Sequence, residues 1–115
     1  MSPKNKKKLN ILRKKLDNLD LRLLNIIKIR TEIIKKVIYL KSHKREIIDK
    51  KRISTILKKI KKESFKRNID PKITHRIWKN MIWSYINFEK KNFKKKIIIY
   101  YEGEVFFLQK LHAFL

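Results

Sequence analysis

The sequence has no cysteine, a single glycine and only two prolines among its 115 residues. Without cysteine, the chain has no disulfide framework, no thiolate zinc site and no cysteine nucleophile. A single glycine, Gly103, excludes the glycine-rich loops that cradle phosphates and dinucleotides. The three histidines are not at metal-ligand spacing to one another, so we predict no metal site. So few turn residues also argue against a monomeric β-sandwich or β-barrel.

Long hydrophobic runs are absent as well. The basic residues near the N-terminus are not followed by an uninterrupted apolar stretch, so this segment does not have the pattern of a secretory signal. No apolar run approaches the roughly 18 residues that a membrane-spanning helix needs. We therefore expect a cytoplasmic protein with no membrane partner.

Acidic residues are scarce, and their scarcity dominates the charge. The 33 Lys and Arg residues outnumber the 10 Asp and Glu residues, which gives a formal net charge of +23 at pH 7. Such a charge first suggests a helical protein that binds RNA or DNA, because phosphate neutralisation supplies most non-specific affinity. Only seven of the basic residues are Arg, however, no known binding motif is present, and aromatics are not interleaved with the basic runs. The abundance of Lys and Ile together also fits the codon bias of a low-GC genome. We predict no specific nucleic-acid partner, and keep nucleic-acid binding as an alternative.

The segment from about residue 6 to residue 41 has the apolar spacing of one uninterrupted helix. Such a helix is roughly 54 Å long, which exceeds the diameter of a compact domain of this size. Its apolar stripe cannot be buried within one chain, so the pattern predicts an intimate oligomer. The stripe is formed by Leu9, Leu12, Leu16, Leu19, Leu23, Ile26, Ile33, Val37 and Leu40.

Two further helices are predicted after a polar break at residues 42–46. The second runs from about Ile48 to Lys66, and the third from Pro71 to about residue 95, with Asp70 as its N-cap. The fold class is therefore all-α, a three-helix protomer with one very long first helix. Residues 97–115 are apolar, β-prone and carry a net charge of −1, with a weak hairpin signal at Gly103. We divide the chain into a helical domain, residues 6–96, and a C-terminal extension, residues 97–115.

Several charged residues fall on the apolar faces of the predicted helices. Arg30 occupies the gap in the first stripe, Lys41 closes that stripe and Arg13 lies at its edge, while Arg52 and Glu89 fall on the buried sides of the second and third helices. A single such cation is usually a snorkelling side chain or half of an ion pair. Several cations converging on a core with few carboxylates indicate instead a pocket for a small dicarboxylate, for which the Arg fork is well suited.

These residues stand in a pattern that resembles the all-helical chorismate mutases. The stretch LRKKLDNLDLRLL at residues 12–24 looks like the opening of that family, and Arg30 and Lys41 follow at the family's spacing. Asp49 and Arg52 are three residues apart, as in the family, and Asp70 precedes the helix that carries the last site residues. The resemblance covers about residues 9–92.

The resemblance implies a dimer of entwined three-helix protomers with a monofunctional activity. Members convert chorismate to prephenate, in phenylalanine and tyrosine biosynthesis, by a Claisen rearrangement that uses no cofactor and no covalent intermediate. The substrate has two carboxylates, and negative charge develops on its ether oxygen in the transition state. Catalysis therefore needs cationic clamps that select the compact conformer, and hydrogen-bond donors at that oxygen.

By position, the resemblance assigns three cations to the substrate's oxygens. Arg13 would bind a carboxylate in the partner protomer's site, and Arg30 would bind one within its own protomer. Lys41 would contact both a carboxylate and the ether oxygen.

Four more positions complete the site that the resemblance implies. Asp49 and Arg52 would lie near the ring hydroxyl, and Tyr85 stands where many members have a small hydroxyl residue. Ile53 stands where the best-known bacterial form has an acidic contact to that hydroxyl. Glu89 takes the place of the second ether-oxygen donor, often Gln, and a carboxyl group can donate only when protonated. We therefore expect the rate to fall as rising pH removes the proton of Glu89, and the Glu89→Gln variant to flatten that profile.

Three other functions stay open. An isochorismate-pyruvate lyase of the same fold uses the same Arg and Lys clamp on a nearly identical substrate. A basic nucleic-acid-binding helical protein would explain the net charge. A degenerate mutase, kept as a structural or regulatory partner, would explain both Ile53 and the unfamiliar C-terminal extension.

Overall fold

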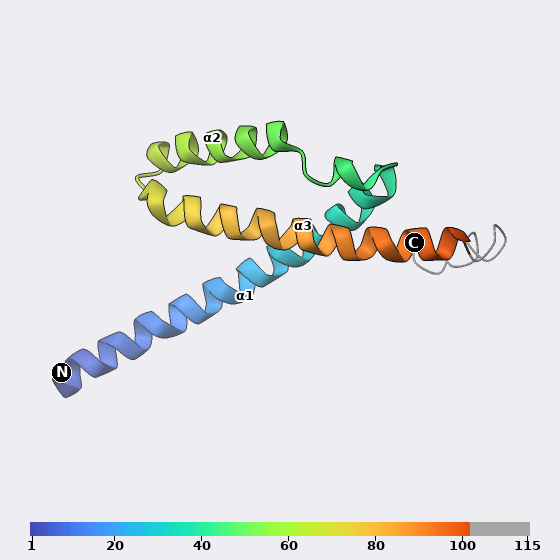
Figure 1. Cartoon of the computed structure of the whole chain (residues 1–115). Coiled ribbons are helices and arrows are strands. Elements are labelled where there is room, and N and C mark those ends of the chain that lie inside the picture. Colours follow the sequence, from blue (N-terminus) through green and yellow to red (C-terminus); the bar gives the residue numbers. More distant parts are fainter. Residues whose placement is uncertain (102–115) are drawn as a thin grey trace. The chain divides into compact units, whose positions relative to one another are not determined.

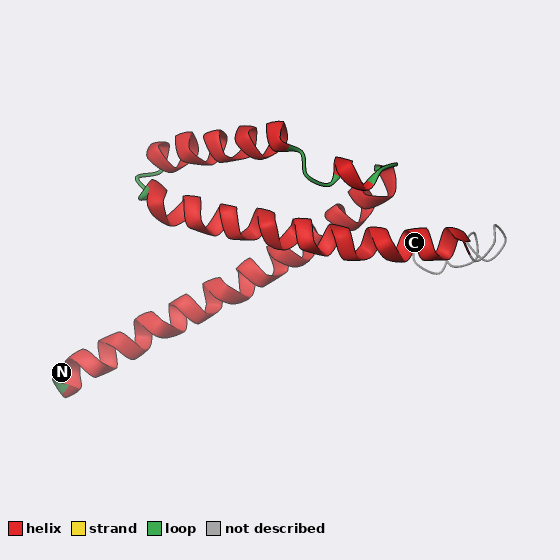
Figure 2. Ribbon diagram, viewed as in Figure 1, coloured by secondary structure: helices red, strands yellow, loops and turns green. Residues whose placement is uncertain are grey.

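The computed structural model describes residues 1–101 of the chain and the side chains of residues 1–93. These residues form helix α1 (Pro3–Leu40), a short 3₁₀ helix η1 (Lys44–Glu46), helix α2 (Lys50–Lys66) and helix α3 (Pro71–Tyr101), shown in Figures 1 and 2. The described part of the chain contains no strand. The predicted all-α fold, with three helices and a very long first one, is confirmed.

The chain divides into two compact units, Met1–Lys36 and the part that starts at Val37. Helix α1 continues through the boundary, so that its last residues belong to the second unit. The first unit is therefore a stretch of one helix, whereas the second contains the end of α1, η1, α2 and α3.

Helix α1 begins at Pro3, slightly earlier than the sequence pattern predicts, because Ser2 caps the helix and Pro3 occupies its first position. The Ser2 hydroxyl oxygen accepts a hydrogen bond from the Asn5 N–H at 3.2 Å, and proline suits the first helical position. No glycine and no further proline interrupts the 38 residues, which gives a helix of about 57 Å. Ile38, in the second unit, is the one buried residue of α1 in this single chain.

The connection between α2 and α3 is a tight turn that satisfies the backbone groups of both helix ends. Asn68 takes a left-handed conformation with φ of 55°, which asparagine tolerates better than most residues. The Ile69 N–H donates to the Ser64 carbonyl at 2.9 Å and the Asn68 N–H to the Phe65 carbonyl at 3.2 Å, which is a Schellman motif. One residue later, the Asp70 carboxylate accepts from the Lys72 N–H at 2.9 Å and caps α3, as predicted.

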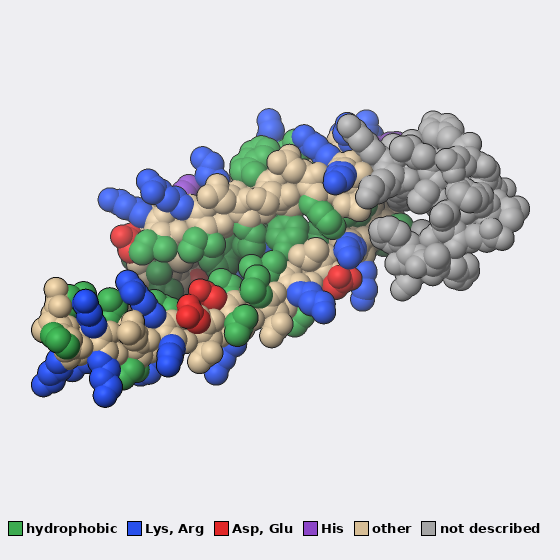
Figure 3. Space-filling model, turned by 90° about the horizontal axis from the view of Figure 1, so that it is seen from below, with side chains coloured by type: hydrophobic (Ala, Val, Ile, Leu, Met, Phe, Trp, Pro, Cys, Tyr) green, Lys and Arg blue, Asp and Glu red, His purple; other side chains and the backbone are tan. Residues whose placement is uncertain are grey.

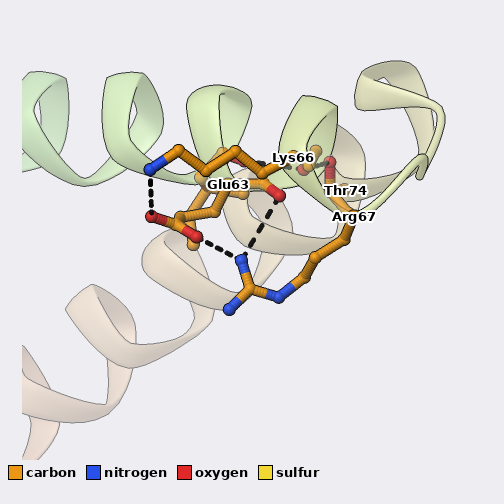
Figure 4. Close-up of polar contacts among 6 residues, drawn as sticks. Glu63, Lys66, Arg67 and Thr74 are labelled. Atoms are coloured by element: carbon orange, nitrogen blue, oxygen red, sulfur yellow. Dashed lines mark hydrogen bonds and ion pairs between the residues drawn. The ribbon is translucent and has the colours of Figure 1, made fainter.

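Side chains on either side of this turn also connect the two helices and stabilise the end of α2. The Ser64 and Thr74 hydroxyl groups form a buried hydrogen bond of 2.7 Å between α2 and α3. On the exposed side, the Glu63 carboxylate pairs with Lys66 and Arg67 (Figure 4). The Arg67 hydrogen bond, with smaller effects of nearby lysines, lowers the pKa of Glu63.

The hydrophobic core of the second unit lies where α2 packs against α3. Ile82, Ile86 and Phe93 of α3 are buried there together with Ile47, which precedes α2. Four half-buried residues pack against this cluster: Ile48, Ile53, Ile56 and Leu57. The predicted apolar faces of the second and third helices therefore do meet each other.

Two predictions concern the C-terminal part of the chain. Helix α3 continues to Tyr101, beyond its predicted end at about residue 95, so residues 97–101 are helical. A helix that is already formed extends at little cost, and this outweighs the strand preference of the β-branched residues Ile97 to Ile99. The hairpin predicted at Gly103 lies outside the described residues.

Basic side chains cover much of the surface. On the face seen in Figure 3, Lys and Arg side chains stand out from the helices and acidic ones are few. No helix in the described part of the chain is both long enough and apolar enough to cross a bilayer.

Candidate functional site

An ion pair between Lys41 and Glu89 is the centre of the candidate site. The Lys41 ammonium nitrogen donates to Oε2 of Glu89 at 3.0 Å, and the two side chains are only 19% and 7% exposed. Lys41 directly follows the last residue of α1, whereas Glu89 lies on α3, 48 positions further along the chain. Two residues that the sequence assigns to one site are therefore in contact.

Burial of both groups makes this pair different from a surface ion pair. Glu89 lies one turn of α3 from the buried residues Ile86 and Phe93. Removing a carboxylate from water is costly unless a cation compensates for it, and Lys41 provides that cation. The pair therefore keeps an ammonium donor and a carboxyl group close together in a poorly hydrated position.

A polar hollow of about 580 Å³ adjoins Lys41 in the second unit. This volume is within the range of small-molecule sites. Two further cationic side chains, Arg45 and Lys50, line the hollow beside Lys41. Neither was predicted from the sequence as a site residue. Arg45 lies in the polar break, where no periodicity indicates which way a side chain points. The hollow is lined by Lys41, Arg45, Glu46, Ile48, Asp49 and Lys50.

Asp49 lines this hollow and also caps the N-terminus of α2. It is the N-cap of α2, and its carboxylate accepts a hydrogen bond from the Arg52 N–H at 2.9 Å. The three-residue spacing between Asp49 and Arg52 is thus also the geometry of a helix cap.

The prediction that Arg52 lies on the buried side of α2 is wrong for this single chain, where Arg52 is exposed. The prediction placed Arg52 four residues after Ile48 and four residues before Ile56 along one helix. The helix begins only at Lys50, so Ile48 lies outside it. Arg52 lies in the first turn of α2, where a long charged side chain can extend into solvent.

The remaining positions of the second unit differ in what surrounds them. Tyr85 is half-buried, and its ring meets the ring of Phe88 edge-on, with 6.5 Å between the ring centres. Ile53 is half-buried and packs against the hydrophobic core. The position at which the resemblance expects an acidic contact to the ring hydroxyl therefore contributes to packing.

Arg13 and Arg30 both belong to the first unit, Arg13 exposed and Arg30 half-buried. They are 17 residues apart on one continuous helix, which corresponds to about 25 Å along its axis and to faces about 100° apart. A single copy of the helix cannot hold one small dicarboxylate with both side chains. Any site that uses both needs two copies of α1.

Comparison with known protein families gives a match. The family model described as chorismate mutase type II matches residues 12–90, about two thirds of the chain. The matched range includes both units and all seven predicted site residues. No curated protein and no solved structure matches the chain.

Proposed function

Because the chain belongs to the chorismate mutase type II family, we propose that it rearranges chorismate to prephenate in the cytoplasm, as a step of phenylalanine and tyrosine biosynthesis. The observation that carries the proposal is the buried pair of Lys41 and Glu89. These are the two positions at which the reaction needs donors to the ether oxygen, and α1 and α3 bring them within hydrogen-bond distance.

The reaction needs no nucleophile, but it needs stabilisation of the negative charge that develops in the transition state. As the C–O bond of the substrate lengthens, negative charge develops on the ether oxygen, and the Lys41 ammonium donates to it. Glu89 becomes the second donor when its carboxyl group holds a proton. Arg30 binds a substrate carboxylate and thereby favours the compact conformer in which the two reacting carbons meet.

Further basic groups bring the substrate in. Arg45 and Lys50 line the hollow beside Lys41, and the whole chain has a net charge of +23. A dianion is drawn toward such a site at a rate that falls with ionic strength. Asp49, Arg52 and Tyr85 contact the part of the substrate that bears the ring hydroxyl, where Ile53 offers no carboxylate.

A homodimer completes the site. Two observations support the dimer: most of the apolar stripe of α1 is exposed in the single chain, and Arg13 and Arg30 are too far apart on one helix to hold the same small dicarboxylate. In the dimer, Arg13 of one protomer binds a carboxylate of the substrate held by the Arg30 and Lys41 of the other.

The decisive experiment follows the loss of chorismate absorbance with purified protein and identifies the product as prephenate. We expect the Arg30→Ala variant to lose at least about a hundredfold in kcat/KM, since it removes a charge-assisted clamp. Full activity of this variant would refute the site assignment. Turnover of isochorismate to salicylate and pyruvate, with chorismate left intact, would instead identify the lyase of the same fold.

The role of Glu89 has its own test in the Glu89→Gln variant. A carboxylate cannot donate to the ether oxygen, whereas the Gln amide can, so kcat/KM of the variant should be at least that of wild type. A large loss in kcat/KM would show that a donor at position 89 does not serve the reaction.

A further inference from the structure

A second hollow lies between α2 and α3, near the turn that joins them, and has a volume of about 560 Å³. Its floor is apolar and is formed by Leu57, Ile60 and Pro71. The volume is typical of a site for a small molecule. We call it the hairpin groove.

Every charged residue in the lining of the hairpin groove is basic. Lys58 and Lys61 lie one turn apart on α2, and Lys72 and Arg76 lie one turn apart on α3, beside His75. Like charges at this spacing repel each other. An anion bound between the two basic pairs would relieve that repulsion while its apolar part covers Leu57 and Ile60. We propose that the hairpin groove binds a small organic anion with an apolar body, such as an aryl or alkyl carboxylate.

The hairpin groove is not the face that best fits a second copy of this chain. The exposed apolar residues of α3, Ile73 and Ile77, lie on the opposite flank of the helix from Pro71 and Lys72, by the 3.6-residue period. An anion with an apolar body can pack against the apolar lining residues and pair its charge with the basic ones.

The groove shares no lining residue with the hollow beside Lys41, so the two can be tested separately. The first experiment titrates 3-phenylpropanoate into the full chain and follows the methyl NMR signals of Leu57 and Ile60. We expect saturable shifts of these signals at 0.15 M salt. The neutral analogue 3-phenylpropan-1-ol should bind at least about fivefold more weakly, because it lacks the charge that the rim recognises.

Matched variants test the role of the rim. The double variant Lys61→Gln/Arg76→Gln should weaken binding of 3-phenylpropanoate at least about fivefold. The control Lys59→Gln/Lys62→Gln removes two charges from α2 outside the lining, and should change the affinity less than twofold. Equal weakening by the two double variants would show that the anion responds to overall charge only, and would overturn the proposal.

The probe could also bind at Lys41, and this possibility is separated by the Lys41→Met variant. Shifts of Leu57 and Ile60 that persist unchanged in this variant support the groove, whatever its effect on turnover of chorismate. The proposal fails if the shifts disappear with Lys41, if the two signals respond only to protein concentration, which would place a second copy in the groove, or if they do not respond to the anion at all.

Discussion

The α2–α3 hairpin and the first 36 residues differ in where their apolar side chains are buried. The hairpin has a core of Ile47, Ile82, Ile86 and Phe93 within one chain. The first 36 residues contain no buried residue, and most of their leucines and isoleucines are exposed.

The difference identifies the source of stability of each part. Helix propensity and the Ser2 cap stabilise an isolated helix only marginally. Leucines that stay exposed to water add no free energy of burial to its stability. The hairpin gains free energy from its own chain, through its core and the capped turn at Asn68 and Asp70. For the first 36 residues, the proposed homodimer would supply the partner surface that buries the stripe.

The largest effect is expected from a charge in the stripe of α1. Leu19→Glu places a carboxylate where the proposed dimer would bury Leu19, which is 54% exposed in the single chain. Burial of a leucine contributes about 1.5–3 kcal/mol, and each dimer contains two copies. We therefore expect dimer dissociation to rise more than about a hundredfold, with loss of helix content and activity. Sedimentation and circular dichroism measure these changes.

The matched control makes the same substitution on the other side of the helix. Leu21 is 61% exposed and lies about 200° around α1 from Leu19. The Leu21→Glu variant should remain a dimer. If Leu19→Glu and Leu21→Glu behave alike, the stripe is not the interface, and the contrast between the two regions has another cause.

The second effect tests the hairpin core. Ile86 is 5% exposed, and Ile86→Ala should lower the free energy of unfolding by about 2–4 kcal/mol through lost burial and a residual cavity. Urea unfolding at fixed protein concentration measures this value, because the stability of the proposed dimer would depend on concentration. The neighbouring exposed Asn87→Ala should stay within about 0.5 kcal/mol of wild type. A cost below about 1 kcal/mol for Ile86→Ala would mean that the hairpin has little core of its own.

The same contrast explains what could be predicted from sequence. Helical periodicity and the Asp70–Pro71 start are local signals, so the three helices and the beginning of α3 were predictable. The exposure of Arg52 was not predictable, because the pattern of Ile48 and Ile56 gave no sign that the cap at Asp49 starts the helix two residues after Ile48. The spacing of Asp49 and Arg52 is expected both for a helix cap and for the family's site, so this spacing alone does not distinguish the two roles.

Residues of the site differ in the same way. Lys41 and Glu89 could be assigned to one site from sequence through the family's pattern, and their side chains do form an ion pair. Arg45 gave no such signal, since it lies outside any helical period in the polar break. The proposed role of Arg13 involves a second chain, and such a role cannot be derived from one sequence without the family's pattern.

A smaller effect is expected at the turn of the hairpin. Ser64→Ala removes the buried hydrogen bond to Thr74, whose hydroxyl group also bonds to the Pro71 carbonyl at 3.3 Å. We expect a loss of about 1 kcal/mol in the free energy of unfolding. Thr55→Ala, which removes an exposed hydroxyl bonded to the Lys51 carbonyl, is the control and should be nearly neutral. A neutral Ser64→Ala would show that the turn is held by its backbone bonds alone.

The smallest effect concerns the ion pairs of Glu63 at the exposed end of α2. Its lowered pKa, caused mainly by Arg67, means that the folded state holds the charged carboxylate better than the unfolded state does. This contribution is present above the ordinary Glu pKa of about 4.5 and is lost as the pH falls through the lower folded-state pKa. Glu63→Gln should therefore lower the urea midpoint slightly at pH 7, and the difference from wild type should vanish at strongly acidic pH.

The control for Glu63 lies in the other region, where Glu32 pairs with Lys35 on α1 at 3.2 Å. Glu32→Gln removes the same charge from a pair with a single cation, whereas Glu63 has two partners and one of them is an Arg. The effect of Glu63→Gln at pH 7 should therefore be the larger of the two. A larger effect of Glu32→Gln would mean that electrostatics stabilise α1 more than they stabilise the hairpin, and that α1 depends less on a partner molecule than its exposed leucines indicate.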